Sequence, residues 1–201
     1  MSDKNLMQVP VGISNRHVHL SQDDLEKLFG KDYRLNPIKD LTQPGQYAAK
    51  ELVTLVGTKG IIEGVRVLGP VRSQTQVEVS RTDCFKLGIN APVRESGVLS
   101  GSPGCVLVGP VGMVALEQGV IIAARHIHMP VELAKTWKLN DKDLVDVLVK
   151  GDRELCFRNV IVRVSSNFEL EFHVDTDEAN AALLKNGDMV TVLGKSASCS
   201  D

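Results

Sequence analysis

The sequence has few aromatic residues, no long apolar run and no marked excess of either charge. Phe, Trp and Tyr make up 4% of the 201 residues, so a core must be built mainly from Val, Leu, Ile and Ala. The formal net charge of -2 gives no electrostatic reason to expect binding to nucleic acid or to an anionic membrane surface. No segment reaches the apolar length that crosses a bilayer, and Met1 to Pro10 lacks the features of a signal peptide. These absences favour a cytoplasmic globular protein.

Several familiar chemical motifs are also absent. There is no Cys-x-x-Cys pair, so we interpret the widely spaced cysteines as reduced core or tail residues and not as disulfides or zinc ligands. There is no His-Glu-x-x-His motif, no Walker phosphate loop and no Gly-x-Ser-x-Gly nucleophile elbow. The nucleophile is therefore expected to come from a substrate. The four cysteines are Cys84, Cys105, Cys156 and Cys199.

Short β-branched stretches separated by glycine and polar breaks occupy most of the chain. Their spacing of roughly 8–12 residues is typical of a barrel or a sandwich. Three short helices are predicted: Gln22 to Phe29, with Ser21 as N-cap and Asp24 completing a capping box; Val131 to Trp137, after Pro130; and 177–185. The expected fold is mainly β with short helices.

A weak internal repeat organises the chain. Arg16-His17-Val18-His19-Leu20 recurs as Arg125-His126-Ile127-His128-Met129, and a predicted helix follows each copy. Leu68-Gly69-Pro70-Val71 is likewise echoed by Val108-Gly109-Pro110-Val111. Two similar β-rich halves are the simplest interpretation.

Four of the five histidines form two His-x-His pairs. Residues i and i+2 of a strand share a face, so each pair presents two imidazoles to one divalent ion. Zinc needs three or four nitrogen, oxygen or sulfur ligands, and cobalt or another borderline ion would accept the same donors. A single His-x-His pair is more often an exposed strand face or a hydrogen-bonded pair, but two copies, each after an arginine and before a helix, favour metal binding. The sequence does not continue like a cupin, which would need a glutamate soon after the pair.

Arg72 lies in the turn 69–75 just before the alternating stretch Gln76 to Ser80, which carries Glu78. A guanidinium offers a planar fork of donors that suits phosphate, although a surface ion pair is the usual role of a single arginine. Glu78 alternates with valines that should face the core, so its carboxylate needs a partner, and a metal is one such partner. The glycine-rich stretch Ser96 to Gly104 is either a lid or a connection.

These motifs, together with Phe172-His173-Val174-Asp175-Thr176-Asp177-Glu178-Ala179-Asn180, resemble the PduL-type phosphate propanoyltransferases (phosphotransacylases) from about Val9 to Leu193. The resemblance implies an acyltransferase that moves a propanoyl or acetyl group between coenzyme A and phosphate by direct displacement at a dinuclear zinc site. It implies one zinc on His17, His19 and Glu78, a second on His126, His128 and His173, and phosphate on Arg72. It also places Ser14, Asn15, Lys59, Arg66 and Asn180 near coenzyme A.

The resemblance further implies two β-barrel domains capped by helices, and a homodimer. The expected domains are 16–123, and 5–15 with 124–194, followed by a disordered tail at 195–201. Members packed into bacterial microcompartments carry an amphipathic extension, whereas only Met1 to Gln8 precede the first motif here. We therefore expect a free cytoplasmic enzyme or a trimmed chain, in acetyl phosphate metabolism or propanediol degradation. The alternatives are a zinc-dependent hydrolase and a non-catalytic protein with structural zinc.

Overall fold

A computed structural model describes residues 7–197, which divide into two compact units. One unit, the barrel unit, consists of the described residues of Met1–Ser14 and Ala124–Asp201, and the other, the half-barrel unit, is Asn15–Ala123. Each unit has its own hydrophobic core. Among the described residues, no helix combines the length and the apolar character that a membrane crossing requires.

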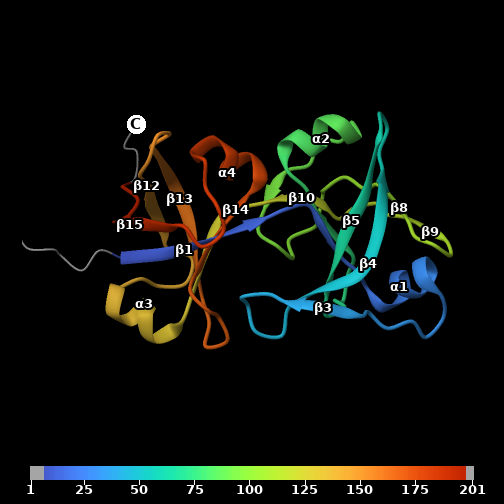
Figure 1. Cartoon of the computed structure of the whole chain (residues 1–201), viewed down its shortest axis with the longest axis horizontal. Coiled ribbons are helices and arrows are strands. Elements are labelled where there is room, and N and C mark those ends of the chain that lie inside the picture. Colours follow the sequence, from blue (N-terminus) through green and yellow to red (C-terminus); the bar gives the residue numbers. More distant parts are fainter. Residues whose placement is uncertain (1–6, 198–201) are drawn as a thin grey trace, which may run out of the picture. The chain divides into compact units, whose positions relative to one another are not determined.

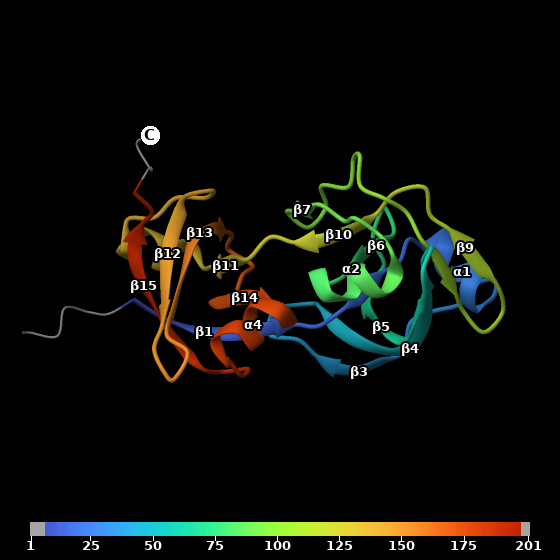
Figure 2. The ribbon, with the colours of Figure 1, turned by 90° about the horizontal axis from the view of Figure 1, so that it is seen from above.

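The barrel unit is a closed six-stranded barrel with the strand order β1-β14-β11-β13-β12-β15. β1 closes it, because Met7 to Pro10 pair antiparallel with β15 and Val11 to Ser14 pair parallel with β14. Figures 1 and 2 show α4 beside β1 and β14. The elements are β1 (Met7–Ser14), β11 (His126–Met129), α3 (Val131–Trp137), β12 (Leu144–Val149), β13 (Leu155–Val164), β14 (Glu171–Asp175), α4 (Thr176–Ala182) and β15 (Met189–Lys195).

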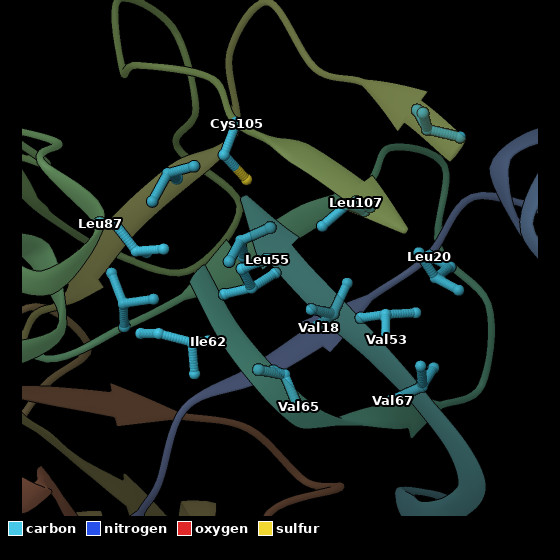
Figure 3. Close-up of a cluster of buried hydrophobic side chains, with 14 of the residues drawn as sticks. Val18, Leu20, Val53, Leu55, Ile62, Val65, Val67, Leu87, Cys105 and Leu107 are labelled. Atoms are coloured by element: carbon cyan, nitrogen blue, oxygen red, sulfur yellow. The ribbon is translucent and has the colours of Figure 1, made fainter. Parts of the chain in front are cut away.

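The half-barrel unit is a nine-stranded sheet with the order β7-β10-β6-β2-β5-β4-β8-β9, and β3 pairs with β4. Figure 3 shows part of its core, to which β2 contributes Val18, β4 contributes Val53 and β5 contributes Val65. The elements are β2 (His17–His19), α1 (Gln22–Phe29), β3 (Pro37–Asp40), β4 (Tyr47–Val56), β5 (Ile61–Gly69), β6 (Gln76–Glu78), α2 (Arg81–Leu87), β7 (Val93–Arg94), β8 (Val106–Val108), β9 (Met113–Ala115) and β10 (Val120–Ala123).

The prediction of a mainly β, barrel-type fold with short helices is confirmed, with one sheet closed and the other a half-barrel. The cores are built from aliphatic side chains with few aromatics, as the composition requires. Cys84 and Cys105 are buried, Cys156 is exposed, and none of these three forms a disulfide. Cys199 lies outside the described residues.

The helix predictions need three corrections. The predicted capping box of α1 is half formed: Ser21 Oγ accepts from the Asp24 amide, but the Asp24 carboxylate accepts from Thr75 Oγ1 at 2.6 Å. The helix predicted at 177–185 is Thr176–Ala182, because Leu183 takes a left-handed conformation that ends it. A fourth helix, α2, was not predicted; it begins with a full capping box between Ser80 and Asp83.

The predicted tail at 195–201 is partly ordered where the structure describes it. Lys195 belongs to β15 and pairs with Val145. The Ser196 amide donates to the Leu144 carbonyl at 2.8 Å, and the Ala197 carbonyl accepts from Arg158 at 3.0 Å. The rest of the predicted tail, 198–201, lies outside the described residues.

Candidate metal centres

The first His-x-His pair lies on β2, in the middle of the half-barrel sheet. β2 runs between β5, which is parallel to it, and β6, which is antiparallel, and the register places His17 opposite Glu78. His17, His19 and Glu78 are all buried, with ligand-type atoms within 4.8 Å of one another. This group, the His₂Glu triad, therefore brings Glu78 to a histidine pair from which it is far removed in sequence.

Hydrogen bonds determine which nitrogens of this triad face inward. His17 Nδ1 lies 2.8 Å from the Asn15 carbonyl, which can only accept, so Nδ1 carries the proton and Nε2 lies 3.4 Å from Glu78 Oε2. His19 Nδ1 is buried and makes no hydrogen bond. A buried polar atom of this kind needs an explanation, and a metal ion on three convergent ligand atoms provides one. The residues present thus fit a zinc-type ion.

The electrostatics of the triad are dominated by burial. Burial and then the neighbouring His17 lower the pKa of His19 to about 3, which keeps this imidazole neutral and able to bind a metal. Burial alone would raise the pKa of Glu78, but His17 and His19 lower it well below its usual range. Burial opposes protonation of His17, yet the charge of Glu78 leaves the pKa of His17 raised. The Glu78 carboxylate therefore stays ionised and pairs with His17, and the His19 imidazole stays neutral.

The second His-x-His pair lies on β11 of the barrel unit, in the equivalent strand arrangement. β11 runs between the parallel β13 and the antiparallel β14, and the register places His126 opposite His173. The ligand-type atoms of His126, His128 and His173 also lie within 4.8 Å of one another. This His₃ triad has ring centroids 4.6 to 5.1 Å apart.

The nitrogens of the His₃ triad are assigned as in the first triad. His126 Nδ1 lies 2.8 Å from the Ala124 carbonyl, which parallels His17 and Asn15. His128 Nδ1 is buried and without a hydrogen bond, like His19 Nδ1. Burial, then His126 and His173, lower the pKa of His128 to about 2. The first histidine of each pair thus has Nε2 available for a metal, and the second has Nδ1.

The arginine before each pair contacts the helix that follows the third ligand. Arg16 donates to Asp83 Oδ1 at 2.8 Å, and Arg125 donates to Glu178 Oε1 at 2.7 Å. Each carboxylate is also the acid of a capping box, which binds the amide of the N-cap residue, Ser80 or Asp175. One carboxylate in each unit therefore connects the start of the His-x-His strand to the end of the third-ligand strand.

Arg72 is connected to the His₂Glu triad through one serine. Its amide donates to the Leu20 carbonyl at 2.9 Å, which fixes the turn against the chain after β2. Its guanidinium donates to Ser96 Oγ at 3.2 Å, and Ser96 in turn donates to Glu78 Oε1 at 3.0 Å. Gln76 also donates to Glu78 Oε1, at 2.5 Å.

Sequence reasoning missed Ser96, Gln76 and Glu171. Ser96 begins the glycine-rich stretch, whose composition does not distinguish a lid from a connection. Gln76 is 2% exposed. Its only sequence signal is its place in the alternating strand, where a buried amide would need a hydrogen-bond partner. Glu171 alternates with His173 on β14 and lies 2.5 Å from its Nε2.

The five residues predicted near coenzyme A fall in both units. Ser14 pairs with Asp175, the N-cap of α4, and Asn180 is exposed on that helix. In the half-barrel unit, Asn15 holds His17, and Arg66 pairs in register with His17 while donating to the Ala49 and Lys50 carbonyls. Lys59 is exposed in the turn before β5.

The chain is mainly β, holds two triads that could each bind a metal ion, and connects an arginine to one of them, so its side chains suit a metal ion and an anion. The family model described as phosphate propanoyltransferase matches residues 10–185. The chain belongs to the phosphate propanoyltransferase family.

Relatives with that name cover most of the chain. The phosphate propanoyltransferase of Thermotoga maritima is 62% identical over 184 residues, which are 91% of this chain and 88% of the relative. That of Lachnoclostridium phytofermentans is 53% identical, and the match covers 96% of this chain and 90% of the relative. That of Salmonella typhimurium is 53% identical, with 87% and 83% covered. The predicted family is confirmed.

Proposed function

We propose that the protein transfers a propanoyl or acetyl group between coenzyme A and inorganic phosphate. Family membership supports the reaction class, and the observation that carries the assignment of roles is the chain of contacts from Arg72 through Ser96 to Glu78. These hydrogen bonds connect the side chain that would bind phosphate to the His₂Glu triad within one unit. An isolated surface arginine would need no such connection.

The metals are the second part of the proposal. His17, His19 and Glu78 would hold one zinc-type ion, and His126, His128 and His173 would hold another. Bound there, divalent ions supply Lewis acidity toward a thioester carbonyl or a phosphate oxygen. The buried, unbonded Nδ1 atoms of His19 and His128 support both sites. We propose that both ions serve the same reaction, as the dinuclear zinc chemistry implied by the resemblance requires.

The chain's own residues perform the remaining tasks. Arg72 would bind phosphate in a bidentate manner and orient an oxygen toward the acyl carbon. As that oxygen forms its bond to carbon, the carbon–sulfur bond breaks and coenzyme A leaves as the thiolate. Ser96 holds the guanidinium, which then needs little rearrangement as charge develops in the transition state. Ser14, Asn15, Lys59, Arg66 and Asn180 remain the predicted contacts to coenzyme A.

The test is coenzyme A release from acetyl- and propanoyl-coenzyme A, with and without phosphate, on protein of known metal content. We expect release to depend on phosphate. The rates with the two thioesters will show which acyl group is preferred. Arg72→Ala should lower kcat/KM for phosphate by about 100- to 1000-fold and leave the metal content unchanged.

Arg34→Ala, at an exposed arginine of the same unit, is the matched control and should behave as wild type. Release that ignores phosphate would instead indicate a hydrolase, and bound metal without any release would indicate structural zinc. Loss of metal from Arg72→Ala would contradict the role given to Arg72.

A further inference from the structure

The residue two positions before each third ligand occupies the same place in both units. Gln76 precedes Glu78 on β6 and pairs in register with His19. Glu171 precedes His173 on β14 and pairs in register with His128. The two side chains are therefore equivalent in the repeat, although one is an amide and the other a carboxylate.

Each of these side chains contacts its own third ligand. Gln76 Oε1 accepts from the Gly97 amide at 2.7 Å, so the other end of the side chain is the donor. That donor, Nε2, lies 2.5 Å from Glu78 Oε1. Glu171 Oε2 lies 2.5 Å from His173 Nε2. With Glu171 as the acceptor in this contact, His173 Nε2 donates, and Nδ1 is the nitrogen that we assign to a metal.

The environment leaves both side chains little freedom. Gln76 is 2% exposed and also donates to Ser96 Oγ at 2.8 Å. The Glu171 side chain is 12% exposed, and its carboxylate packs against β1: a Cβ on Gly12 would lie 2.6 Å from Glu171 Cδ. Both contacts to the third ligands are therefore held by the surrounding protein.

We propose that Gln76 and Glu171 are positioning residues that orient the third metal ligand of each triad. In one unit the ligand is the anionic group and its partner is neutral, and in the other unit the partner is the anionic group. A carboxylate ligand is held by an amide donor in the half-barrel unit. An imidazole ligand is held by a carboxylate acceptor in the barrel unit. Each ion would then have one carboxylate, as a direct ligand in one unit and behind a ligand in the other. The inference rests on the metal sites of the proposed function.

This difference has a chemical consequence for the histidine ligand. A carboxylate that accepts from the far nitrogen of a metal-binding imidazole fixes its tautomer and ring orientation and makes the ligating nitrogen more basic. Loss of such a partner lowers metal affinity by about 10- to 100-fold in general. Glu171 is therefore expected to act on the His₃ site alone, and Gln76 on the His₂Glu site alone.

The test measures the affinity of each site for Zn²⁺ and Co²⁺ by competition with a chelator. The two sites are separated by working in His19→Ala protein, which keeps the His₃ site, and in His128→Ala protein, which keeps the His₂Glu site. In the first background, Glu171→Leu should weaken binding about 10- to 100-fold and change the visible Co²⁺ spectrum. Glu171→Gln keeps an acceptor without the charge and should weaken binding less.

The reciprocal variant and the control complete the design. Gln76→Met removes the donor and should weaken binding only in the background that keeps the His₂Glu site. Glu154→Gln makes the same chemical change as Glu171→Gln at an exposed position of the barrel unit and should have no effect. Circular dichroism and thermal unfolding verify that each variant folds.

Unchanged affinity in Glu171→Leu, or equal weakening of both sites by either variant, would overturn the proposal. So would the absence of metal binding in the parent backgrounds. Acyl transfer is scored separately on otherwise unaltered protein. If transfer fails while the site-selective affinities appear, the proposed reaction is wrong and the positioning roles stand.

Discussion

The two triads differ less in their strands than in where they carry negative charge. In both units a His-x-His strand lies between a parallel and an antiparallel neighbour, and the third ligand lies opposite the first histidine. In the half-barrel unit that ligand is Glu78, and Arg72 lies within two hydrogen bonds of it. In the barrel unit it is His173, and the carboxylate lies behind it on Glu171.

If both triads bind metal as proposed, the comparison indicates how one strand arrangement would support two metal sites of different character. An anionic ligand reduces the Lewis acidity of an ion more than an imidazole does, so the His₃ ion should be the stronger Lewis acid. Arg72 lies at the other triad, where a bound ion would have an anionic ligand and a cationic neighbour. The repeat thus preserves strand geometry and allows the electrostatics to diverge.

The largest effect is expected from removing one ligand in either unit. His19→Ala and His128→Ala should each abolish one of the two ions and lower acyl transfer by about 100- to 1000-fold, if both ions serve one reaction. Metal analysis and steady-state kinetics on the two proteins measure this. Full activity in either variant would assign catalysis to the other triad alone.

The next effect compares the two arginine–carboxylate contacts. Asp83→Ala should destabilise the protein by about 2–3 kcal/mol, because Asp83 is 4% exposed and both caps α2 and binds Arg16. Glu178→Ala should cost only about 1 kcal/mol, because Glu178 is more exposed and Arg125 keeps its bonds to the Arg158 carbonyl.

Urea unfolding measures the difference between these variants. The single tryptophan, Trp137, lies on α3 and reports on the barrel unit, whereas far-ultraviolet circular dichroism reports on both units. Equal destabilisation by the two changes would show that burial does not set the strength of this contact.

A smaller effect separates the two units by their response to acid. Burial alone would raise the pKa of Glu51, but hydrogen bonds from Asn36 outweigh it and lower the pKa. Its contribution is therefore present above about pH 4.3 and is lost as the pH falls through the lower folded value. Burial raises the pKa of Asp175 at the N-cap of α4, so its ionisation opposes folding at neutral pH and this cost disappears in acid.

Stability curves from pH 6 to pH 3 measure this contrast as differences from Glu51→Gln and Asp175→Asn. The wild-type advantage over Glu51→Gln should shrink in acid, and that over Asp175→Asn should grow, each by at most about 1.4 kcal/mol per pH unit. Asparagine keeps the cap at position 175, so the second difference reports charge. If both stability differences changed in the same direction as the pH falls, the assigned directions of the two pKa shifts would be wrong.

The smallest effect on stability is expected from Gly12→Ala. The added Cβ would collide with the carboxylate end of the Glu171 side chain and not with backbone, so the cost should stay within about 1 kcal/mol. The displaced carboxylate should nevertheless weaken the His₃ site measurably, with the His₂Glu site unchanged. Chelator competition measures this. Unchanged affinity would mean that Glu171 reaches His173 by another rotamer.

Local patterns predict the elements well and the contacts between them poorly. The strand period of two makes the His-x-His pairs visible, and Ser21 and Gly30 bound α1 where the sequence indicates. Glu78 and His173 become ligand candidates mainly through the family resemblance, because their registers join strands that are far apart in sequence. Closure of one sheet and not the other depends on the same kind of long-range pairing.

Two residues illustrate why the remainder is not predictable. The alternation Gln76 to Ser80 extends the expected strand through Ser80, whereas β6 ends at Glu78 and Ser80 caps α2. Ser80 and Asp83 do fit a capping box, but strand and cap compete for the same residue and tertiary contacts decide. Ser96 carries no local signal, because its role follows from a loop that returns to β6.

The closure of the barrel by β1 links its completion to both ends of the described chain. During synthesis, Asn15–Ala123 emerges as one continuous segment, so the His₂Glu triad is complete while much of the barrel is still unmade. β1 is made before the half-barrel unit but pairs with β14 and β15, which are made after it. We expect the nascent protein to capture its first ion before its second, in an order that pulsed metal labelling of stalled ribosomes would reveal.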